Sequence, residues 1–233
     1  MALTFLQAPA IDLSDATTYT FSSQNLGTAS ADRYIIVATA SRGLGATRSI
    51  SSATIGGVSA TKVAEVANTG GGNTSTTCLL IAAVPSGTTG DVAITYDSGM
   101  LRCGIGMWAA TALTSATPTD TATSTADDPT ESTLDVNAGG FAIAVGYTAN
   151  QATTTWTGLT EKYDAQDLGE GITHSGASDT FASAQTNLTI TCDFTAVQLS
   201  AGSFASWGMT SGHNTRFIIN KLRPRIFGPG LAR

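Results

Sequence analysis

Large apolar side chains recur at every second position in several short segments of the chain. In the segment 141–147, Phe, Ile, Val and Tyr alternate with Ala and Gly, and the segments 92–96 and 188–194 repeat this spacing. Successive side chains of a β-strand point to opposite faces of a sheet, so the spacing predicts strands half-buried in an antiparallel sheet. The runs 34–37 and 78–81 are apolar at every position and predict central strands.

Turn signals separate these predicted strands. Pro85, Ser86 and Gly87 supply a fixed φ followed by a residue that tolerates positive φ, and Gly70 to Gly72 mark a loop tip. Short strands with turns every 8–12 residues or so are typical of a sandwich or a barrel. The pattern therefore predicts an all-β fold, an antiparallel β-sandwich with jelly-roll-like connections.

The chain also repeats part of its own pattern, which predicts two related halves. Three segments of the first half resemble three of the second: 18–21 and 132–136, 33–38 and 140–145, 92–97 and 188–193. Each set is followed by a strand of small residues that carries one tryptophan, Trp108 or Trp207. The offsets are similar but unequal, as expected for a shared strand order with shorter loops in the second half.

Two arrangements fit this repeat. Each half could close its own small sandwich, or both could pack as one large sandwich with pseudo-twofold character. The small faces of many strands suit close packing against a second layer, which favours one domain, residues 1–211, with two sheets around a shared core. Its pseudo-repeats would span about 16–113 and 130–211, joined by a Thr/Asp-rich surface linker at 114–129. Residues 212–233 would form a separate C-terminal arm.

Composition excludes several classes of protein. Only 12% of the 233 residues are charged and 42% are hydrophobic, which is too apolar for a disordered chain. The scarcity of Lys, Glu and helical stripes argues against a helical bundle. No run approaches the roughly 20 apolar residues that span a bilayer, and the first ten residues lack the features of a signal peptide. We therefore expect a soluble protein without a membrane partner.

Charge is distributed unevenly along the chain. The net charge is −6, but from Gly212 onward there are five basic residues and no acid, so the rest of the chain carries −6 minus 5, or −11. An acidic body repels phosphates, so nucleic acid is not an expected partner. The arm mixes basic and large apolar residues, and we expect it to dock on the surface of a neighbouring subunit. The residues expected to make this contact are Arg216, Phe217, Ile219, Lys221, Arg223, Arg225 and Phe227.

Candidate chemistry gathers in the acid-dense segment 164–174. Asp164, Asp167 and Glu170 are a weak candidate site for Ca²⁺, although they do not match the EF-hand spacing and a solvated loop is the favoured interpretation. His174 ends this segment, but a Ser-His-Asp relay is built from separate segments and no G-x-S-x-G turn is present. We therefore expect no catalytic residues, no enzyme activity, no metal and no cofactor.

Two further residue types invite a functional interpretation. Trp156 could stack on a sugar ring, although an isolated tryptophan in a strand is more often part of a core or an interface. Cys78, Cys103 and Cys192 are odd in number and show no CxxC spacing. Each lies in an apolar or alternating run, which predicts buried free thiols in a protein made in a reducing compartment.

The turn and strand motifs carry a family resemblance. The segments 52–61, 83–92 and 102–105, continued by 141–145 and 155–161, resemble a loose family of virion structural β-sandwich proteins. Tailed bacteriophages, prophages and gene transfer agents encode this family, and the resemblance covers most of residues 18–210. It brings no catalytic residues.

The resemblance implies a non-enzymatic, homo-oligomeric component of a phage-like particle, of the head-spike, capsid-decoration or tail-fibre type. Its partners would be other copies of itself and other virion proteins, such as capsid, spike or tail components. It would reside in the virion, assembled in the cytoplasm of the host bacterium. The alternative is a carbohydrate-binding or receptor-binding β-sandwich module that binds a host-surface glycan through Trp156 and the acid-rich loop 164–174.

Overall fold

The computed structural model describes residues 3–166 and 172–210, and within these ranges the chain forms β-strands and no helix. The strands of the first half are β1 (Leu3–Asp12), β2 (Ala16–Asn25), β3 (Tyr34–Leu44), β4 (Ile50–Ile55), β5 (Val58–Ser59), β6 (Thr61–Gly70), β7 (Asn73–Ala83), β8 (Thr89–Met100) and β9 (Arg102–Ala110). Those of the second half are β10 (Asp120–Ser124), β11 (Thr130–Val136), β12 (Phe141–Thr148), β13 (Thr154–Thr157), β14 (Glu161–Ala165), β15 (Thr173–Thr180), β16 (Gln185–Phe194) and β17 (Ala201–Trp207).

The predicted fold class is confirmed, because the protein is all-β and all thirteen strand pairings among the described residues are antiparallel. The runs 34–37 and 78–81 lie in β3 and β7, which are central strands of their sheet, as predicted. A search of the described residues for a helix long and apolar enough to cross a membrane finds none.

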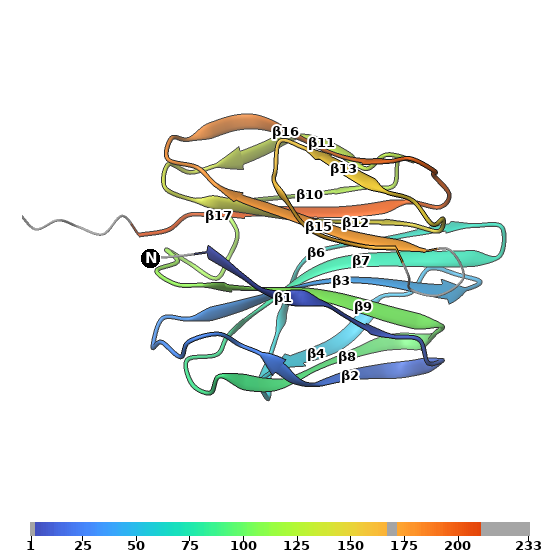
Figure 1. Ribbon diagram of the computed structural model, residues 1–233, viewed down its shortest axis with the longest axis horizontal. Helices are drawn as coiled ribbons and strands as arrows, with labels where there is room; N and C mark the ends of the chain where they lie inside the picture. Colours follow the sequence, from blue (N-terminus) through green and yellow to red (C-terminus); the bar gives the residue numbers. More distant parts are fainter. Residues whose placement is uncertain (1–2, 167–171, 211–233) are drawn as a thin grey trace, which may run out of the picture.

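Four sheets are stacked as layers (Figure 1). The outer sheet of the first half has the order β2-β8-β4-β5 and the inner one β1-β9-β3-β7-β6. Next come the inner sheet of the second half, β10-β17-β12-β15-β14, and its outer sheet, β11-β16-β13. Each sheet uses strands of one half only, so each half closes its own sandwich. The favoured expectation of two sheets around one core therefore differs from the observed four layers.

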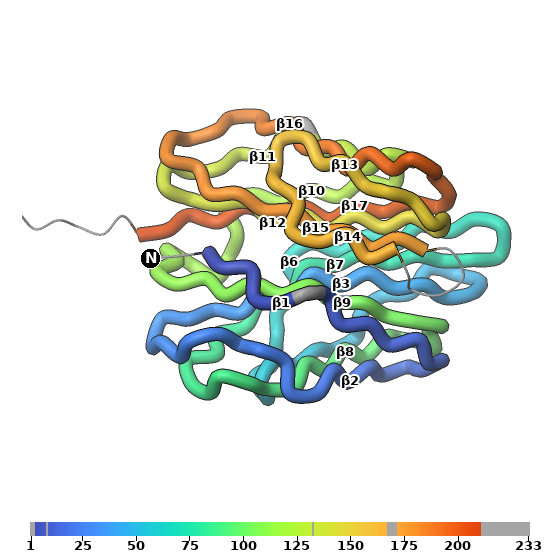
Figure 2. The backbone as a smooth tube through the Cα atoms, viewed as in Figure 1, coloured from blue at the N-terminus to red at the C-terminus, as the bar shows by residue number. Residues whose placement is uncertain are grey.

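The two halves share one strand order. β5 has no equivalent in the second half. When the remaining strands are counted in chain order within each half, strands with the same count occupy the same position in the inner sheets and in the outer sheets. The segment pairs that suggested the repeat lie on equivalent strands: β2 and β11, β3 and β12, β8 and β16, β9 and β17. Figure 2 shows the halves as a lower body in blue to green and an upper body in yellow to red. Most connections alternate between the two sheets, which is compatible with the expected jelly-roll-like order.

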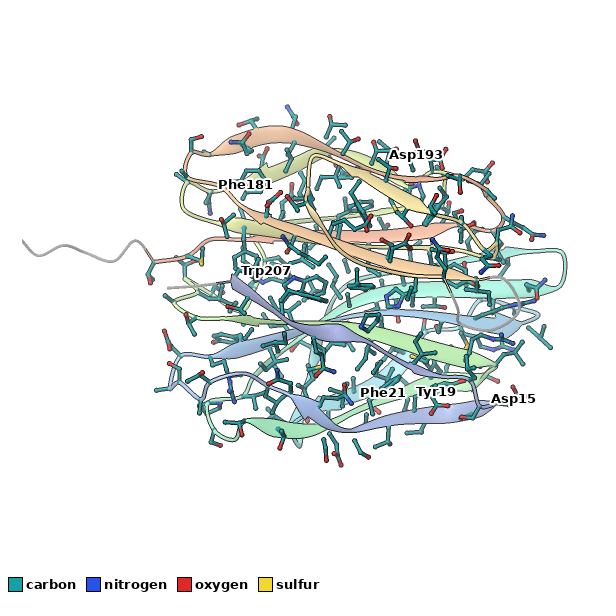
Figure 3. All side chains as sticks on the ribbon, viewed as in Figure 1. Asp15, Tyr19, Phe21, Phe181, Asp193 and Trp207 are labelled. Atoms are coloured by element: carbon teal, nitrogen blue, oxygen red, sulfur yellow. The ribbon has the colours of Figure 1, made fainter. Side chains whose placement is uncertain are left out.

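Three apolar layers fill the spaces between the four sheets. One lies inside each sandwich, and a third lies between the two inner sheets. This middle layer takes side chains from both halves, such as Ile36 and Trp108 from the first and Ile143 and Trp207 from the second. Trp207 is labelled in this space in Figure 3. The inner sheets are thus covered on both faces, and their central strands, such as β9, β12 and β17, have no solvent face.

This double burial corrects one expectation and confirms another. The segment 141–147 was expected to be half-buried, but all eight residues of β12 are buried, with the large side chains in the middle layer and Ala142 and Ala144 inside the second sandwich. In the outer sheets the half-buried pattern is confirmed. Ile94 of β8 and Ile190 of β16 are fully buried, whereas their Thr neighbours lie on the other face.

Two strands lie where the sequence predicted none. Residues 120–124, inside the expected linker 114–129, form β10 and pair with β17. Residues 3–12, before the expected start of the first repeat, form β1 and pair with β9. Both are edge strands, so pairing with one neighbour suffices and a strong apolar alternation is not required.

The halves meet with pseudo-twofold character. β1 of the first half lies against β14 of the second, and the equivalent β10 lies against β6. Hydrogen bonds cross this interface, including Thr77 Oγ1 to Ser203 Oγ at 3.0 Å and Asn68 Nδ2 to the Ser200 carbonyl at 2.8 Å. That residues 1–211 behave as one domain stays a prediction.

Candidate functional site

A group of aromatic and polar side chains surrounds Tyr163, between the two inner sheets. Its ring lies between Gly106 of β9 and Gly176 of β15, where an added Cβ would come within 2.2 and 2.4 Å of the ring carbon Cε1. The ring also stacks on Phe5, with centroids 5.7 Å apart. Only glycine fits on either side of this tyrosine, so the two halves approach closely here. In the sequence, the signal for this contact is Gly106, a glycine inside an apolar strand, because such a glycine often marks a close approach of another segment.

His174 is the hydrogen-bond partner of Tyr163. The Tyr163 Oη and His174 Nε2 atoms are 2.6 Å apart, and His174 Nδ1 is buried without a partner among the described residues. Burial lowers the pKa of His174 to about 3, because a charged imidazolium is poorly solvated there. The imidazole is therefore neutral at physiological pH and acts as a buried hydrogen-bonding group.

The other members of the considered relay do not converge on His174. Ser175 follows it on β15 and therefore points to the opposite face of the sheet. Its Oγ donates to the Tyr163 carbonyl at 2.9 Å. The Asp179 carboxylate accepts hydrogen bonds from the amide and the hydroxyl of Thr160, each at 2.8 Å. These three side chains serve three separate structural contacts.

Of the candidate calcium ligands, only Asp164 lies among the described residues. Its two carboxylate oxygens accept from the Thr154 amide at 3.0 Å and the Thr154 hydroxyl at 3.1 Å, which ties β14 to β13. Asp167 and Glu170 lie outside the described residues. Within the ranges that the structure describes, no group of three His, Cys, Asp or Glu residues is placed to hold a metal ion.

Trp156 lies in β13 and is half-buried in the wall of the second sandwich. Its ring packs against two apolar clusters, including the small one formed by Ala152, Cys192 and Phe194. The indole N–H donates to Ser175 Oγ at 2.8 Å. The side chain thus contributes to packing and holds one strand of the outer sheet to the inner sheet.

The three cysteines are free and buried, as predicted. Burial raises the pKa of the Cys103 thiol to about 11, and it also raises the pKa values of Cys78 and Cys192. Thiolates are the reactive form of cysteine, so none of the three is activated as a nucleophile. The residues of the expected assembly arm, from Arg216 to Phe227, lie outside the described residues.

Each outer sheet carries a pair of threonine hydroxyl groups that face each other across two strands. Thr18 and Thr95 face each other across β2 and β8, with their Oγ1 atoms 2.9 Å apart. Thr130 donates to Thr191 at 3.4 Å across the equivalent strands β11 and β16. The same hydroxyl pair therefore recurs at the same place in both halves, at the two poles of the molecule.

No family model, no curated protein sequence and no solved structure matches the chain.

Proposed function

We propose that this chain is a non-enzymatic structural protein, a homo-oligomeric component of a phage-like particle at the head, a spike or the tail. One observation carries the proposal: in the described part of the chain, the candidate catalytic and metal-binding side chains singled out from the sequence take part in the packing and hydrogen bonding of the scaffold. His174, Asp164 and the three cysteines are engaged or buried inside the scaffold. Such a protein acts as a structural scaffold that contacts other proteins through its surface. The family resemblance favours a virion as the assembly to which it belongs.

The surfaces of the stack support the same proposal. Each pole carries a pair of threonine hydroxyl groups at the same place, Thr18 with Thr95 and Thr130 with Thr191. The chain then continues into an arm with five basic residues and no acid. An acidic body with a basic, apolar extension is suited to contacts between identical copies or with another acidic surface.

Particle fractionation tests this function. Particles would be purified on a density gradient from a strain that carries a tagged copy of the gene, and their proteins identified by mass spectrometry. We expect the chain to comigrate with the capsid proteins in a fixed ratio, and particle images to lose one feature when the gene is deleted. If the chain stays with the soluble host proteins and the particles are unchanged, the proposal is wrong.

The alternative, a glycan-binding module, makes a different prediction. Sugar stacking needs an open aromatic face, whereas the Trp156 ring is half-buried against two apolar clusters. A glycan array with and without chelator separates the two functions. Glycan binding that is abolished by Trp156→Ala in a correctly folded variant would favour the alternative.

A further inference from the structure

The edge strands of the four sheets differ in how well they are protected against pairing with another chain. An edge strand exposes unpaired backbone groups, and charges, proline or a short length block their use. β6, β10, β11 and β14 carry charged residues, β1 contains Pro9, and β5 and β13 have only two and four residues. Among the described residues, β2 is the one edge strand that is long, uncharged and without proline.

One hydrogen bond establishes which backbone groups of β8 face β2. The Gly56 N–H donates to the Asp91 carbonyl at 2.8 Å, so the backbone of Asp91 faces β4. Hydrogen bonding alternates between the two sides of a strand from one residue to the next. The backbone groups of Val92 and Ile94 therefore face β2, and the residues of β2 that pair with them face β8.

The residues of β2 in between face away from the sheet. Phe21 pairs with Val92 and Tyr19 with Ile94, and both aromatic side chains are buried. The backbone N–H and C=O groups of Thr18 and Thr20 therefore point to the open side of β2. Both threonines are exposed. β2 lies in the lowest layer in Figure 1, and Tyr19 and Phe21 are labelled there in Figure 3.

The open side of β2 is covered at its C-terminal end and free further back. The Asn25 N–H donates to Gln7 Oε1 of β1 at 2.9 Å, so β1 occupies that end. In the described part of the chain, Thr18 and Thr20 have no backbone hydrogen bond other than those of the pairing with β8. That pairing is regular from Thr18 to Phe21, between two register shifts. A regular stretch with open backbone groups thus remains for another strand.

The β2 strand of a second copy fits this stretch. In an antiparallel pair centred on Tyr19, Thr18 of each copy lies opposite Thr20 of the other, and each such pair exchanges two backbone hydrogen bonds. Threonine opposite threonine is a favourable cross-strand pair. Asp15, the residue before β2, falls opposite the uncharged Ser23. The other edge strands would bring a charge or a proline into the pair, or are too short, so the edge best matched to β2 is β2 itself.

We propose that two copies of this chain form a twofold dimer through antiparallel pairing of their β2 strands. The contact uses the same residues on both copies, so it closes on itself, and it joins two outer sheets into one continuous sheet. The inference rests on the proposed function, because it identifies a contact of the homo-oligomer.

Charges placed across the pair test both the contact and its register. In full-length protein, Thr18→Lys with Thr20→Lys places lysine opposite lysine, whereas Thr18→Lys with Thr20→Glu places each lysine opposite a glutamate of the other copy. Thr20→Pro removes an N–H on the open side, which an edge strand tolerates. The control is Thr186→Lys with Thr189→Lys, which adds the same charge at two exposed positions of β16, a central strand.

Sedimentation velocity over a range of concentrations gives the dissociation constant of the dimer, and thermal melts verify the fold of each variant. We expect the wild-type protein, the control and the Lys/Glu variant to be dimeric. The Lys/Lys variant and Thr20→Pro should dimerise at least tenfold more weakly, because like charges face each other in one and a backbone donor is lost in the other. If Thr20→Pro melts below the parent, the two charge variants, which leave the backbone intact, decide the question.

The outcomes separate the contact from the proposed function. A Lys/Lys variant that dimerises as tightly as the control overturns the β2 contact and leaves the proposed function standing. A Lys/Glu variant that loses the dimer overturns the register centred on Tyr19. A wild-type protein that is monomeric at all concentrations overturns the contact and the homo-oligomeric part of the proposed function, whereas particle fractionation tests its place in a virion.

Discussion

Gly106→Ala tests the close approach of the two halves at a single atom. A Cβ at this position would lie 2.2 Å from Cε1 and 2.6 Å from Cζ of the Tyr163 ring. Ordinary carbon contacts are about 3.5–4.0 Å. The ring cannot retreat, because Gly176 leaves no more space on its other side. Overpacking costs about 1–3 kcal/mol, and loss of the Tyr163–His174 hydrogen bond adds about 1 kcal/mol, for a total of about 2–4 kcal/mol.

Thermal unfolding monitored by tryptophan fluorescence measures this effect, since Trp108 lies 6.1 Å from Tyr163 between ring centroids. For a chain of this size, about 2–4 kcal/mol corresponds to a Tm lower by about 4–16 °C. Gly99→Ala is the matched control, because no atom lies within 4 Å of its added Cβ. Tyr163→Leu should partly rescue Gly106→Ala. If Gly106→Ala melts with the control, the described packing between the halves is wrong.

Three further predictions concern buried side chains of known chemistry. The pKa of His174 is about 3 in the folded protein against 6.5 for a free imidazole, so its contribution is complete above pH 6.5 and falls as the pH decreases. Urea unfolding should therefore show stability lower by about 2 kcal/mol at pH 5.0 than at pH 7.5, and an equal decrease in His174→Gln would contradict this. The three cysteines should react with a maleimide at pH 8 only after denaturation, and labelling of the native protein would show that a thiol is accessible. Trp156→Ala should lower stability by about 2–4 kcal/mol, measured as urea unfolding, and an unchanged midpoint would mean that its ring is not part of the wall.

The sequence was sufficient to predict strands of the outer sheets in which large apolar residues alternate with polar ones, as in β8 and β16. In β8 and β16 the alternation of Ile with Thr reports a real difference between core and solvent, so the residues assigned to the core are the buried ones. The repeat was visible for the same reason, since equivalent strands keep the same pattern. These features depend only on local spacing, which a single sequence contains.

The number of layers could not be obtained in this way. In β12 the alternation of Phe141 and Ile143 with Ala142 and Ala144 reports two different apolar surroundings, not a core and a solvent face. Large and small side chains can alternate either because one face of the strand is exposed to solvent or because one face packs more closely against a neighbouring sheet. Only the position of the neighbouring sheet distinguishes these cases, and that position is a long-range property of the fold.

The candidate site illustrates the same limit. Tyr163 was not singled out, because a tyrosine in a short polar strand has no pattern of its own. Its role depends on Gly106 from one half and Gly176 from the other, which are 57 and 13 residues away in the chain. His174 drew attention because of its acidic neighbours in sequence, yet its actual partner is the tyrosine hydroxyl on the adjacent strand. Side chains that meet across a sheet or between sheets leave little trace in local spacing.

The divergence of the two halves gives a direction to a molecule that is otherwise close to symmetric. Leu13 follows β1, and Leu44 is the last residue of β3. The equivalent strands β10 and β12 end in Ser124 and Thr148. Likewise, β9 continues into the connection between the halves, but its equivalent β17 continues into the basic arm. Two identical halves would present the same surfaces and would favour face-to-face pairing of copies. With the exposed Leu13 and Leu44 in the first half and the basic C-terminal segment attached to the second, copies of this chain are expected to associate in one direction through contacts other than the β2 pair.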